Sequence, residues 1–84
     1  MKTITPPIVL SIAGSDPSAG AGIQQDLKTM TALGAYAATA ITAVTAQNTL
    51  GVQDVMPLPA DIVRTQILAV FADLEVRAVK IGML

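Results

Sequence analysis

The sequence has neither cysteine nor histidine among its 84 residues. Without cysteine the chain cannot form a disulfide framework or a thiolate metal site. Without histidine it lacks the commonest general base, the commonest metal ligand and the usual member of a catalytic triad. We therefore expect no metal centre and no histidine-based catalysis in this chain.

Charged residues are also scarce, at 13% of the chain with a net charge of −1 and no basic cluster. Nothing here would attract a nucleic acid or an anionic membrane, so neither is expected as a partner. The 25 residues between Lys28 and Asp54 carry no charge, a length that would permit a membrane span. They are mostly alanine, threonine and glycine and include Gln47, Asn48 and Gln53, which favours a helix end followed by a buried strand. Prolines near the start also interrupt the apolar core that a signal peptide needs, so a cytoplasmic protein is expected.

The length and composition together predict part of a domain. A chain of 84 residues forms one domain at most. Hydrophobic residues make up 52% of it, which is high for a small free-standing domain with a large relative surface. Some apolar faces are therefore expected to pack against a partner or against further chain.

The stretch IVLSIAGSDPSAGAGIQQDL organises the amino-terminal part. Its apolar, β-branched start at residues 8–12 predicts a strand covered on both faces. A turn-rich loop follows at residues 14–20, and Ser18 is predicted to cap the next helix. Gly20 and Gly22 would let the first helical turn approach a ligand closely. A helix that starts at the carboxyl end of a central strand lies at the usual ligand crevice of an open α/β sheet.

The familiar nucleotide-binding motifs are absent from this loop. Gly14 precedes Gly20 by six positions and Ala21 follows, so the P-loop spacing and its lysine are missing. The dinucleotide fingerprint needs a glycine three residues after Gly22, and Gln25 stands there. The spacing leaves open both a site for a polar small molecule and a tight connection without a ligand.

The next two elements are a helix and a strand. Ile23, Leu27 and Met30 form an apolar stripe that predicts a helix over residues 21–33, ended by Gly34 in a left-handed cap. Residues 35–47 predict one strand that is apolar on both faces. Ile41, Ala43, Thr45 and Gln47 would share one face of that strand.

The carboxyl-terminal part predicts a turn at residues 48–51, a short edge strand at 52–56, a helix after Pro59 and a strand at 76–84. Asp61 would lie in the first turn of the helix, where it complements the helix dipole. The helix would bury one face, made of Val63, Ile67, Val70, Phe71 and Leu74. The predicted order of strand, helix, strand, strand, helix, strand implies an α/β fold with a parallel sheet and right-handed crossovers. Because no helix follows to cover the last strand, we interpret the chain as half a domain.

Gln47 is the most informative polar residue, because it ends a buried strand where such sheets keep their sites. Its carboxamide offers an acceptor beside a donor, which complements the amine and ring nitrogen of an aminopyrimidine. On the residues alone, Gln47 satisfying loop backbone groups is the favoured alternative. Asp26 is either a ligand contact or a solvated helix carboxylate. Lys80 is expected to pair with a carboxylate rather than reach a phosphate, and Asp16 is expected to form a turn without a catalytic role.

Three segments in order, AGSDPSAGAGIQQDLKTM, ITAVTAQNT and KIGML, resemble the amino-terminal part of the hydroxymethylpyrimidine/phosphomethylpyrimidine kinases. The resemblance covers residues 8–84, and Ala19 departs from it, because the family often has a second glycine there. The resemblance implies a ribokinase-like three-layer α/β fold with helices on both faces of a parallel sheet. Residues 1–84 would be the substrate-side portion of one such kinase domain.

The resemblance also implies roles for individual residues. Gln47 would bind the pyrimidine and Asp26 would contact polar groups of the substrate. Gly14 would offer its backbone to the ring edge, and Met83 would pack on the ring face, with an ordinary core methionine as the favoured alternative. Gly20 and Gly22 would form the glycine-rich phosphate loop. The catalytic base, the nucleotide site and the anion hole would lie in a carboxyl-terminal half, so no catalytic residue is expected here.

The activity that the resemblance implies is the phosphorylation of 4-amino-5-hydroxymethyl-2-methylpyrimidine and its monophosphate in thiamine biosynthesis. It would use ATP and Mg²⁺ in a protein that is a homodimer at full length, and the 84-residue chain alone would be inactive. The alternatives are a truncated binding or assembly module and a related kinase of pyridoxal or a sugar. Gln47 argues against a sugar, which has no edge of amine and ring nitrogen.

Overall fold

A computed structural model describes residues 6–82 of the chain, and the structural statements below refer to that part. Its elements are β1 (Ile8–Ala13), α1 (Gly22–Ala32), β2 (Tyr36–Ile41), β3 (Ala43–Asn48), β4 (Gly51–Pro57), α2 (Ala60–Asp73) and β5 (Val76–Ile81). The α/β class expected from the sequence is confirmed. No helix in the described part is long and apolar enough to cross a membrane.

The central sheet has three parallel strands in the order β2-β1-β5. The predicted parallel pairing is therefore confirmed. β1 lies in the middle, and Leu10 on β1 and Ala40 on β2 are completely buried. Apolar, β-branched residues suit such a strand, because both of its faces are covered. The carboxyl ends of β1 and β5 are joined further by a hydrogen bond of 2.8 Å from the Gly82 N–H to the Ile12 carbonyl.

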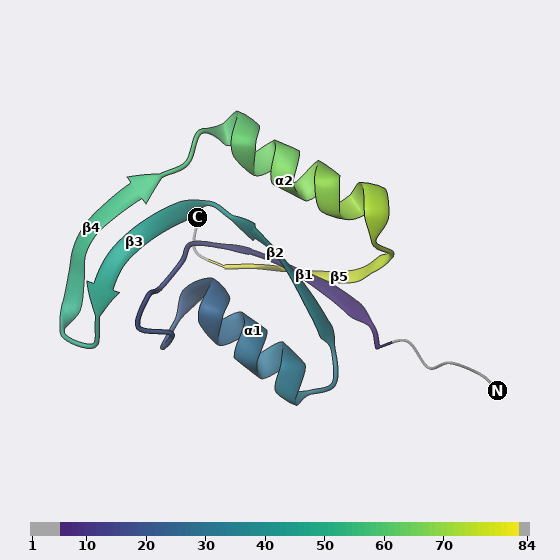
Figure 1. Ribbon diagram of the computed structural model, residues 1–84, viewed down its shortest axis with the longest axis horizontal. Helices are drawn as coiled ribbons and strands as arrows, with labels where there is room; N and C mark the ends of the chain where they lie inside the picture. Colours follow the sequence, from purple (N-terminus) through teal and green to yellow (C-terminus); the bar gives the residue numbers. More distant parts are fainter. Residues whose placement is uncertain (1–5, 83–84) are drawn as a thin grey trace.

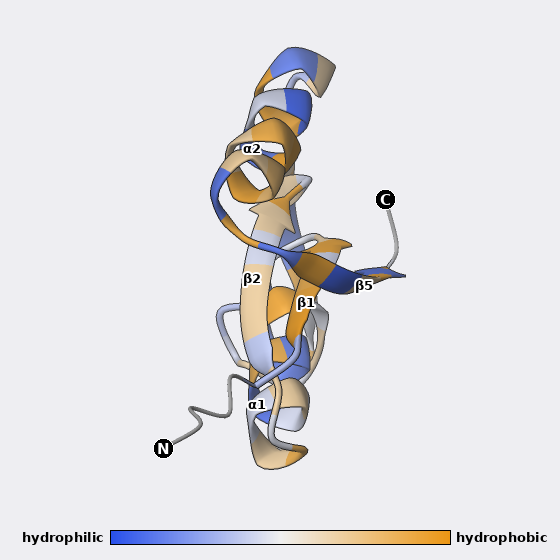
Figure 2. Cartoon of the chain, turned by 90° about the vertical axis from the view of Figure 1, so that its right-hand side faces the viewer, coloured by the Kyte–Doolittle hydropathy of each residue, from blue (hydrophilic) through white to orange (hydrophobic). Residues whose placement is uncertain are grey.

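The two helices lie on opposite faces of the sheet (Figure 1). α1 packs on β1 and β2, and α2 packs on β2. Figure 2 shows the hydrophobic β1 between the two helices. Ile23 is only 4% exposed and anchors α1, so the predicted stripe is confirmed at Ile23, while its other members, Leu27 and Met30, are half-buried. The face predicted for α2 is only half-buried, and the prediction is wrong for Phe71, which is 50% exposed.

The single strand predicted over residues 35–47 is wrong, because the chain breaks at Thr42 into β2 and β3. The Thr42 N–H donates to the Ala13 carbonyl at 3.0 Å, and the Thr42 carbonyl accepts from the Leu58 N–H at 2.9 Å. Beyond this point β3 leaves the central sheet and pairs antiparallel with β4. Ile41 therefore ends β2 and does not share a strand face with Gln47.

The antiparallel pair β3 and β4 forms an arm, which we call the β3–β4 arm, that projects beyond the central sheet (Figure 1). The predicted turn is confirmed as a two-residue connection in which Asn48 Oδ1 accepts from the Leu50 N–H at 2.9 Å. Every residue of β4 is exposed, as a strand at an edge would be. Leu50, Met56 and Val52 are 93%, 69% and 60% exposed, so the arm carries apolar surface that other protein would cover.

The predicted cap of α1 is wrong. The residue before α1 is Ala21, and no side chain caps this helix. The Ser18 N–H and hydroxyl instead donate to Asp16 Oδ1 at 2.9 and 2.6 Å, so the prediction of Asp16 as a turn former is confirmed. Gly34 has φ +86°, which confirms the left-handed end of the helix. The end of the predicted last strand, residues 83–84, lies outside the described part.

Candidate functional site

An open hollow of about 430 Å³ lies at the carboxyl ends of the central strands, beside the β3–β4 arm. Three parts of the chain form its walls: the loop between β1 and α1, strands β3 and β4, and the end of β5. Its lining includes Gly14, Ser15, Gly22, Thr42, Thr45, Gln47 and Lys80. The carboxyl edge of a parallel sheet is where ligands of open α/β folds bind.

Gly14 and Gln47 line the same hollow, although they come from different elements. Three hydrogen bonds hold the β1–α1 loop against β3. The Ser15 N–H donates to the Ala43 carbonyl at 2.9 Å, and the Thr45 N–H donates to Ser15 Oγ at 3.1 Å. The Thr45 hydroxyl donates to the Ser15 carbonyl at 2.6 Å. These bonds fix the position of the loop relative to Gln47.

The side chain of Gln47 is half-buried, and its Nε2 donates to Thr45 Oγ1 at 2.8 Å. Its hydrogen bond in the structure is thus to a hydroxyl rather than to the loop backbone that the alternative interpretation required. Within residues 6–82 no hydrogen bond to Gln47 Oε1 is found. The carbonyl oxygen and the second N–H of this amide are therefore available to a ligand in the hollow.

Gly22 lines the hollow and has φ +60°, a conformation that residues with a side chain rarely adopt. A Cβ at this position would lie 2.5 Å from the Gly14 carbonyl oxygen. That oxygen accepts a hydrogen bond of 2.9 Å from the Ile23 N–H. The sequence predicted that Gly22 would let the helix approach a ligand closely. In the structure the group that it approaches is the Gly14 carbonyl. The other predicted loop glycine, Gly20, is exposed and does not line the hollow.

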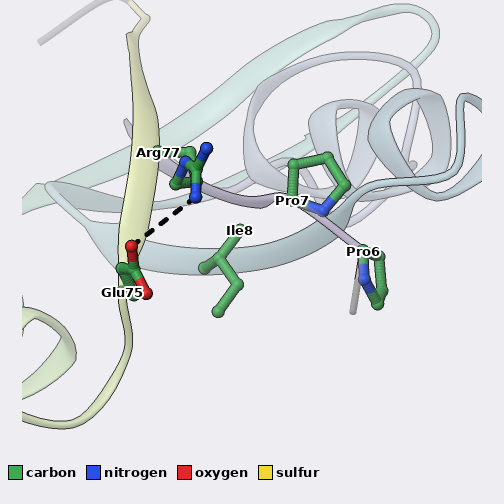
Figure 3. Close-up of a pocket in the computed structure, with 5 residues that line it drawn as sticks. All are labelled: Pro6, Pro7, Ile8, Glu75 and Arg77. Carbon is green, nitrogen blue, oxygen red and sulfur yellow. Dashed lines mark ion pairs between the residues drawn. The ribbon is translucent and has the colours of Figure 1, made fainter. Parts of the chain in front are cut away.

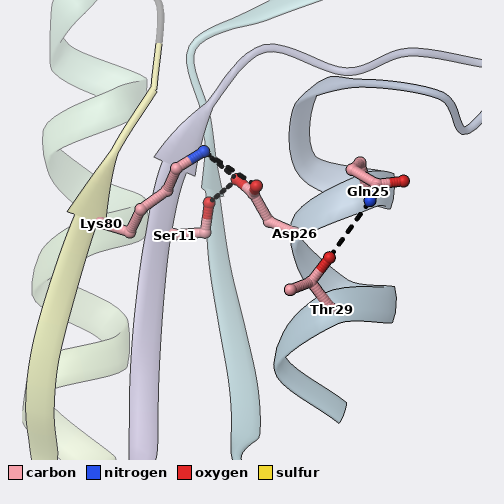
Figure 4. Close-up of polar contacts among 5 residues, drawn as sticks. All are labelled: Ser11, Gln25, Asp26, Thr29 and Lys80. Atoms are coloured by element: carbon pink, nitrogen blue, oxygen red, sulfur yellow. Dashed lines mark hydrogen bonds and ion pairs between the residues drawn. The ribbon is translucent and has the colours of Figure 1, made fainter. Parts of the chain in front are cut away.

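Asp26 lies beside this site in a network that joins α1, β1 and β5 (Figure 4). Its carboxylate accepts from the Ser11 hydroxyl at 2.6 Å and from Lys80 Nζ at 2.8 and 2.9 Å. The pairing predicted for Lys80 is confirmed, and Asp26, 12% exposed, is not a solvated carboxylate. Lys80 lines the hollow, whereas Asp26 is not among the residues that line it.

The pKa of Asp26 reflects two opposing influences. Burial is the largest and acts to raise it, because a charged carboxylate is poorly solvated there. The hydrogen bonds from Lys80 and Ser11, together with the charge of Lys80, outweigh burial and hold the pKa below its ordinary value. Asp26 is therefore ionised at neutral pH and keeps the Lys80 ammonium at the wall of the hollow.

Asp16 rigidifies the loop. Hydrogen bonding from the Ser18 hydroxyl is the main cause that lowers its pKa, and burial opposes it. The Asp16 N–H in turn donates to Gln24 Oε1 at 2.7 Å, which ties the loop to α1. Ala19 has φ +65°, so the residue that stands in place of the family's glycine adopts a conformation that favours glycine.

The sequence interpretation missed several residues around the site. Ser11 is fully buried within an apolar strand, and a buried hydroxyl there was itself a signal that it had a polar partner. Thr45 looked like an ordinary strand residue. Thr42 Oγ1 is buried at the hollow and has no hydrogen-bond partner among the described residues. Gln66 of α2 bonds both backbone groups of Ile41, at 2.8 and 2.9 Å.

Met83, predicted to pack on a ligand ring, lies outside the described residues. Within residues 6–82 there is no group of three or more histidine, cysteine, aspartate or glutamate residues that could hold a metal ion. A second hollow, of about 390 Å³, lies at the opposite, amino-terminal end of β1 and β5 (Figure 3). Prolines and the exposed ion pair Glu75–Arg77, 3.5 Å long, form its walls. None of the predicted site residues lies there.

Comparison with known proteins gives concordant results. The family model described as Phosphomethylpyrimidine kinase matches residues 16–84. Hydroxymethylpyrimidine/phosphomethylpyrimidine kinase of Mycobacterium tuberculosis H37Rv is 59% identical over 81 residues, 96% of this chain and 30% of its own length. The enzyme of that name from Rhizobium meliloti is 64% identical over 76 residues, 90% of this chain and 29% of its own. The chain thus spans about 30% of the length of these relatives.

Solved structures agree with the sequence relatives. The crystal structure of phosphomethylpyrimidine kinase from Clostridium difficile 630 superposes with a TM-score of 0.89 and 58% identity, over 93% of this chain and 34% of that chain. Pyridoxal kinase from Staphylococcus aureus in complex with AMP-PCP gives a TM-score of 0.84 and 42% identity, over 95% of this chain and 29% of that chain. These neighbours confirm the ribokinase-like fold class, of which the chain forms an amino-terminal part. By sequence, by fold and by the match over residues 16–84, the chain belongs to the phosphomethylpyrimidine kinase family.

Proposed function

We propose that residues 1–84 are the amino-terminal, substrate-side portion of a single ribokinase-like domain. The protein that contains them would phosphorylate 4-amino-5-hydroxymethyl-2-methylpyrimidine and its monophosphate in thiamine biosynthesis. Family membership and the names of the relatives support this activity. A cytoplasmic location and a homodimer at full length belong to the same proposal.

One observation carries the proposal: Gly14 and Gln47 line the same hollow at the carboxyl edge of the sheet. Within residues 6–82 the carbonyl oxygen and one N–H of the half-buried carboxamide have no partner, and they are the pair that an amine beside a ring nitrogen requires. Backbone groups of the β1–α1 loop would meet the edge of the ring, and Gly22, which has no side chain, lets the start of α1 pack closely against the Gly14 carbonyl of this loop. Val52 and Val55 supply an apolar wall for the flat face.

The role of this portion is to bind and orient the acceptor. Lys80 places its ammonium group at the wall of the hollow, where it is paired with the Asp26 carboxylate. Phosphoryl transfer also needs a bound donor, groups that stabilise the transferring phosphoryl, and a base for the attacking hydroxyl. ATP is the proposed donor, since the Staphylococcus aureus relative was solved with AMP-PCP. The family resemblance implies Mg²⁺ as well, and a ligand set for it is proposed outside residues 6–82; within those residues there is no group of three or more histidine, cysteine, aspartate or glutamate residues that could hold a metal ion.

The test is Gln47→Ala in the full-length protein, with Gln53→Ala as the matched control. Gln53 is an exposed glutamine of β4 that does not line the hollow. Loss of two hydrogen bonds to the ring should lower kcat/KM for the aminopyrimidine about tenfold to a hundredfold, while the control stays near wild type. Unchanged kinetics in Gln47→Ala would rule out the proposed pyrimidine contact. The 84-residue chain by itself should show no turnover.

A second candidate is a kinase of pyridoxal, favoured by the 42% identity to the Staphylococcus aureus pyridoxal kinase. Parallel kinetics with pyridoxal and the aminopyrimidine would separate the two activities. A higher kcat/KM for pyridoxal would replace the first proposal by the second.

A further inference from the structure

The orientation of the Gln47 carboxamide is determined by its neighbour Thr45. The Thr45 hydroxyl lies 2.6 Å from the Ser15 carbonyl oxygen. A carbonyl oxygen can only accept, so the single hydroxyl proton of Thr45 must be donated to Ser15. The Thr45 oxygen is left with lone pairs alone, and it can only accept from any further partner.

That further partner is Gln47, at 2.8 Å from Thr45 Oγ1. Because the hydroxyl proton is already used, only the NH₂ end of the carboxamide can face Thr45. The reversed amide would place two oxygen atoms 2.8 Å apart with no proton between them. The assignment of nitrogen and oxygen in this side chain thus follows from the hydrogen-bond chain itself.

Gln47 Oε1 and one Nε2–H have no partner among the described residues, and they are presented in a fixed order. An amine beside an unprotonated ring nitrogen, the edge of a 4-aminopyrimidine, donates to the oxygen and accepts from the N–H. An oxo group beside a ring N–H has the opposite order. It would match only a reversed amide, or a ligand turned over so that its hydroxymethyl group moved elsewhere.

We propose that Thr45 is the positioning residue that makes this site select a 4-aminopyrimidine over its 4-oxo counterpart. The Ser15 carbonyl fixes the direction of the Thr45 hydroxyl proton, and the Thr45 oxygen in turn fixes the orientation of the Gln47 amide. The proposal rests on the proposed function, since it assumes that the Gln47 carboxamide forms hydrogen bonds with the amine and ring nitrogen of the pyrimidine.

The experiment measures kcat/KM of the full-length protein for 4-amino-5-hydroxymethyl-2-methylpyrimidine and for its 4-oxo analogue. Thr45→Val keeps the β-branched shape and removes the hydroxyl, so the amide is free to reverse. The ratio of the two kcat/KM values should then fall about tenfold or more, on the scale of one hydrogen bond to a buried group. Thr45→Ser keeps the hydroxyl and should restore the ratio.

Ser15→Ala is the matched control for a loosened loop. It removes the bond from the Thr45 N–H to Ser15 Oγ but leaves the carbonyl that receives the Thr45 proton. The selectivity ratio should therefore survive in Ser15→Ala. Thr45→Ala, with dissociation constants of both pyrimidines measured by calorimetry, replaces Thr45→Val if the valine variant does not fold.

An unchanged ratio in Thr45→Val or Thr45→Ala would overturn the proposal, as would a wild-type protein that does not discriminate or an equal loss in Ser15→Ala. The Gln47→Ala variant separates this failure from failure of the proposed function. If Gln47→Ala loses pyrimidine activity while the Thr45 variants keep the ratio, only the role of Thr45 is wrong. If Gln47→Ala has no effect, the proposed function itself fails.

Discussion

Gly22→Ala is the substitution whose effect the structure specifies most closely. Gly22 has φ +60°, and a Cβ would lie 2.5 Å from the Gly14 carbonyl oxygen, well inside contact distance. Gly34 also has a left-handed φ, +86°, but a Cβ there would meet nothing within 4 Å. The two alanine variants therefore share the conformational cost and differ in the contact alone.

The magnitudes follow from these two sites. A left-handed alanine costs about 1–2 kcal/mol, offset by about 0.4–1 kcal/mol because alanine restricts the unfolded chain. At Gly22 the new methyl must also displace the Gly14 carbonyl from the Ile23 N–H, and that bond contributes about 1 kcal/mol. The expected loss in the free energy of unfolding is about 2 kcal/mol for Gly22→Ala and about 1 kcal/mol for Gly34→Ala.

The assay is urea denaturation of the full-length protein with both variants, together with KM for the aminopyrimidine. KM should rise for Gly22→Ala, because Gly14 lines the hollow, and should not change for Gly34→Ala. Asparagine tolerates a left-handed backbone, so Gly22→Asn should still be destabilised while Gly34→Asn is nearly neutral. Equal losses at the two positions would refute the reasoning from the Gly14 contact.

Two further predictions concern polar groups at the edges of the sheet. Gln66→Leu leaves the N–H and carbonyl of Ile41 without partners and should lower the free energy of unfolding by about 1–3 kcal/mol in urea denaturation; an unchanged midpoint would contradict this. Lys80→Met removes the cation beside Asp26, so burial should raise the carboxyl pKa, which an NMR titration reports directly. In the wild type the depressed pKa stabilises the fold above the ordinary carboxyl pKa, and this contribution is lost as pH falls through the folded pKa. The stability deficit of Lys80→Met should therefore shrink below about pH 4, and a deficit that is constant with pH would show that the ion pair is not its cause.

Local patterns predicted the parts of the fold that local chemistry determines. The stripe of Ile23, Leu27 and Met30 predicted α1, because an apolar face must lie on the sheet. Asp16 before Pro17 predicted the turn, because a short carboxylate accepts from the backbone two residues later. Both features depend on residues close together in the sequence, so they can be predicted without knowing which distant segments pair.

Features that depend on pairing between distant segments were not predictable. Residues 35–47 read as one strand because no glycine or proline marks Thr42, and the break follows from pairing with β4 and the bond to Ala13. Ser18 is of a residue type that often caps helices, but its hydroxyl donates to Asp16 Oδ1 instead of taking part in a cap.

The site was predicted in part. Because strand ends meet at one edge of a parallel sheet, the sequence predicted that the loop glycine and Gln47 would lie together. Lys80 was expected to find a carboxylate, but its partner Asp26 lies 54 positions away and could not be named. The hydroxyl of Thr45 has no distinctive sequence signature, since its role depends on the Ser15 carbonyl 30 positions earlier.

The position of β1 in the middle of the sheet has a consequence for biosynthesis. β1 comes first among the described strands, yet one of its two neighbours, β5, is the last of them. Until β5 is translated, a nascent chain can pair β1 only with β2, and Asp26 has no ammonium group to neutralise it. Contacts of such long sequence separation form late and leave apolar strand edges open in the meantime. Ribosome-bound intermediates that stop short of residue 76 should therefore expose one unpaired edge of β1.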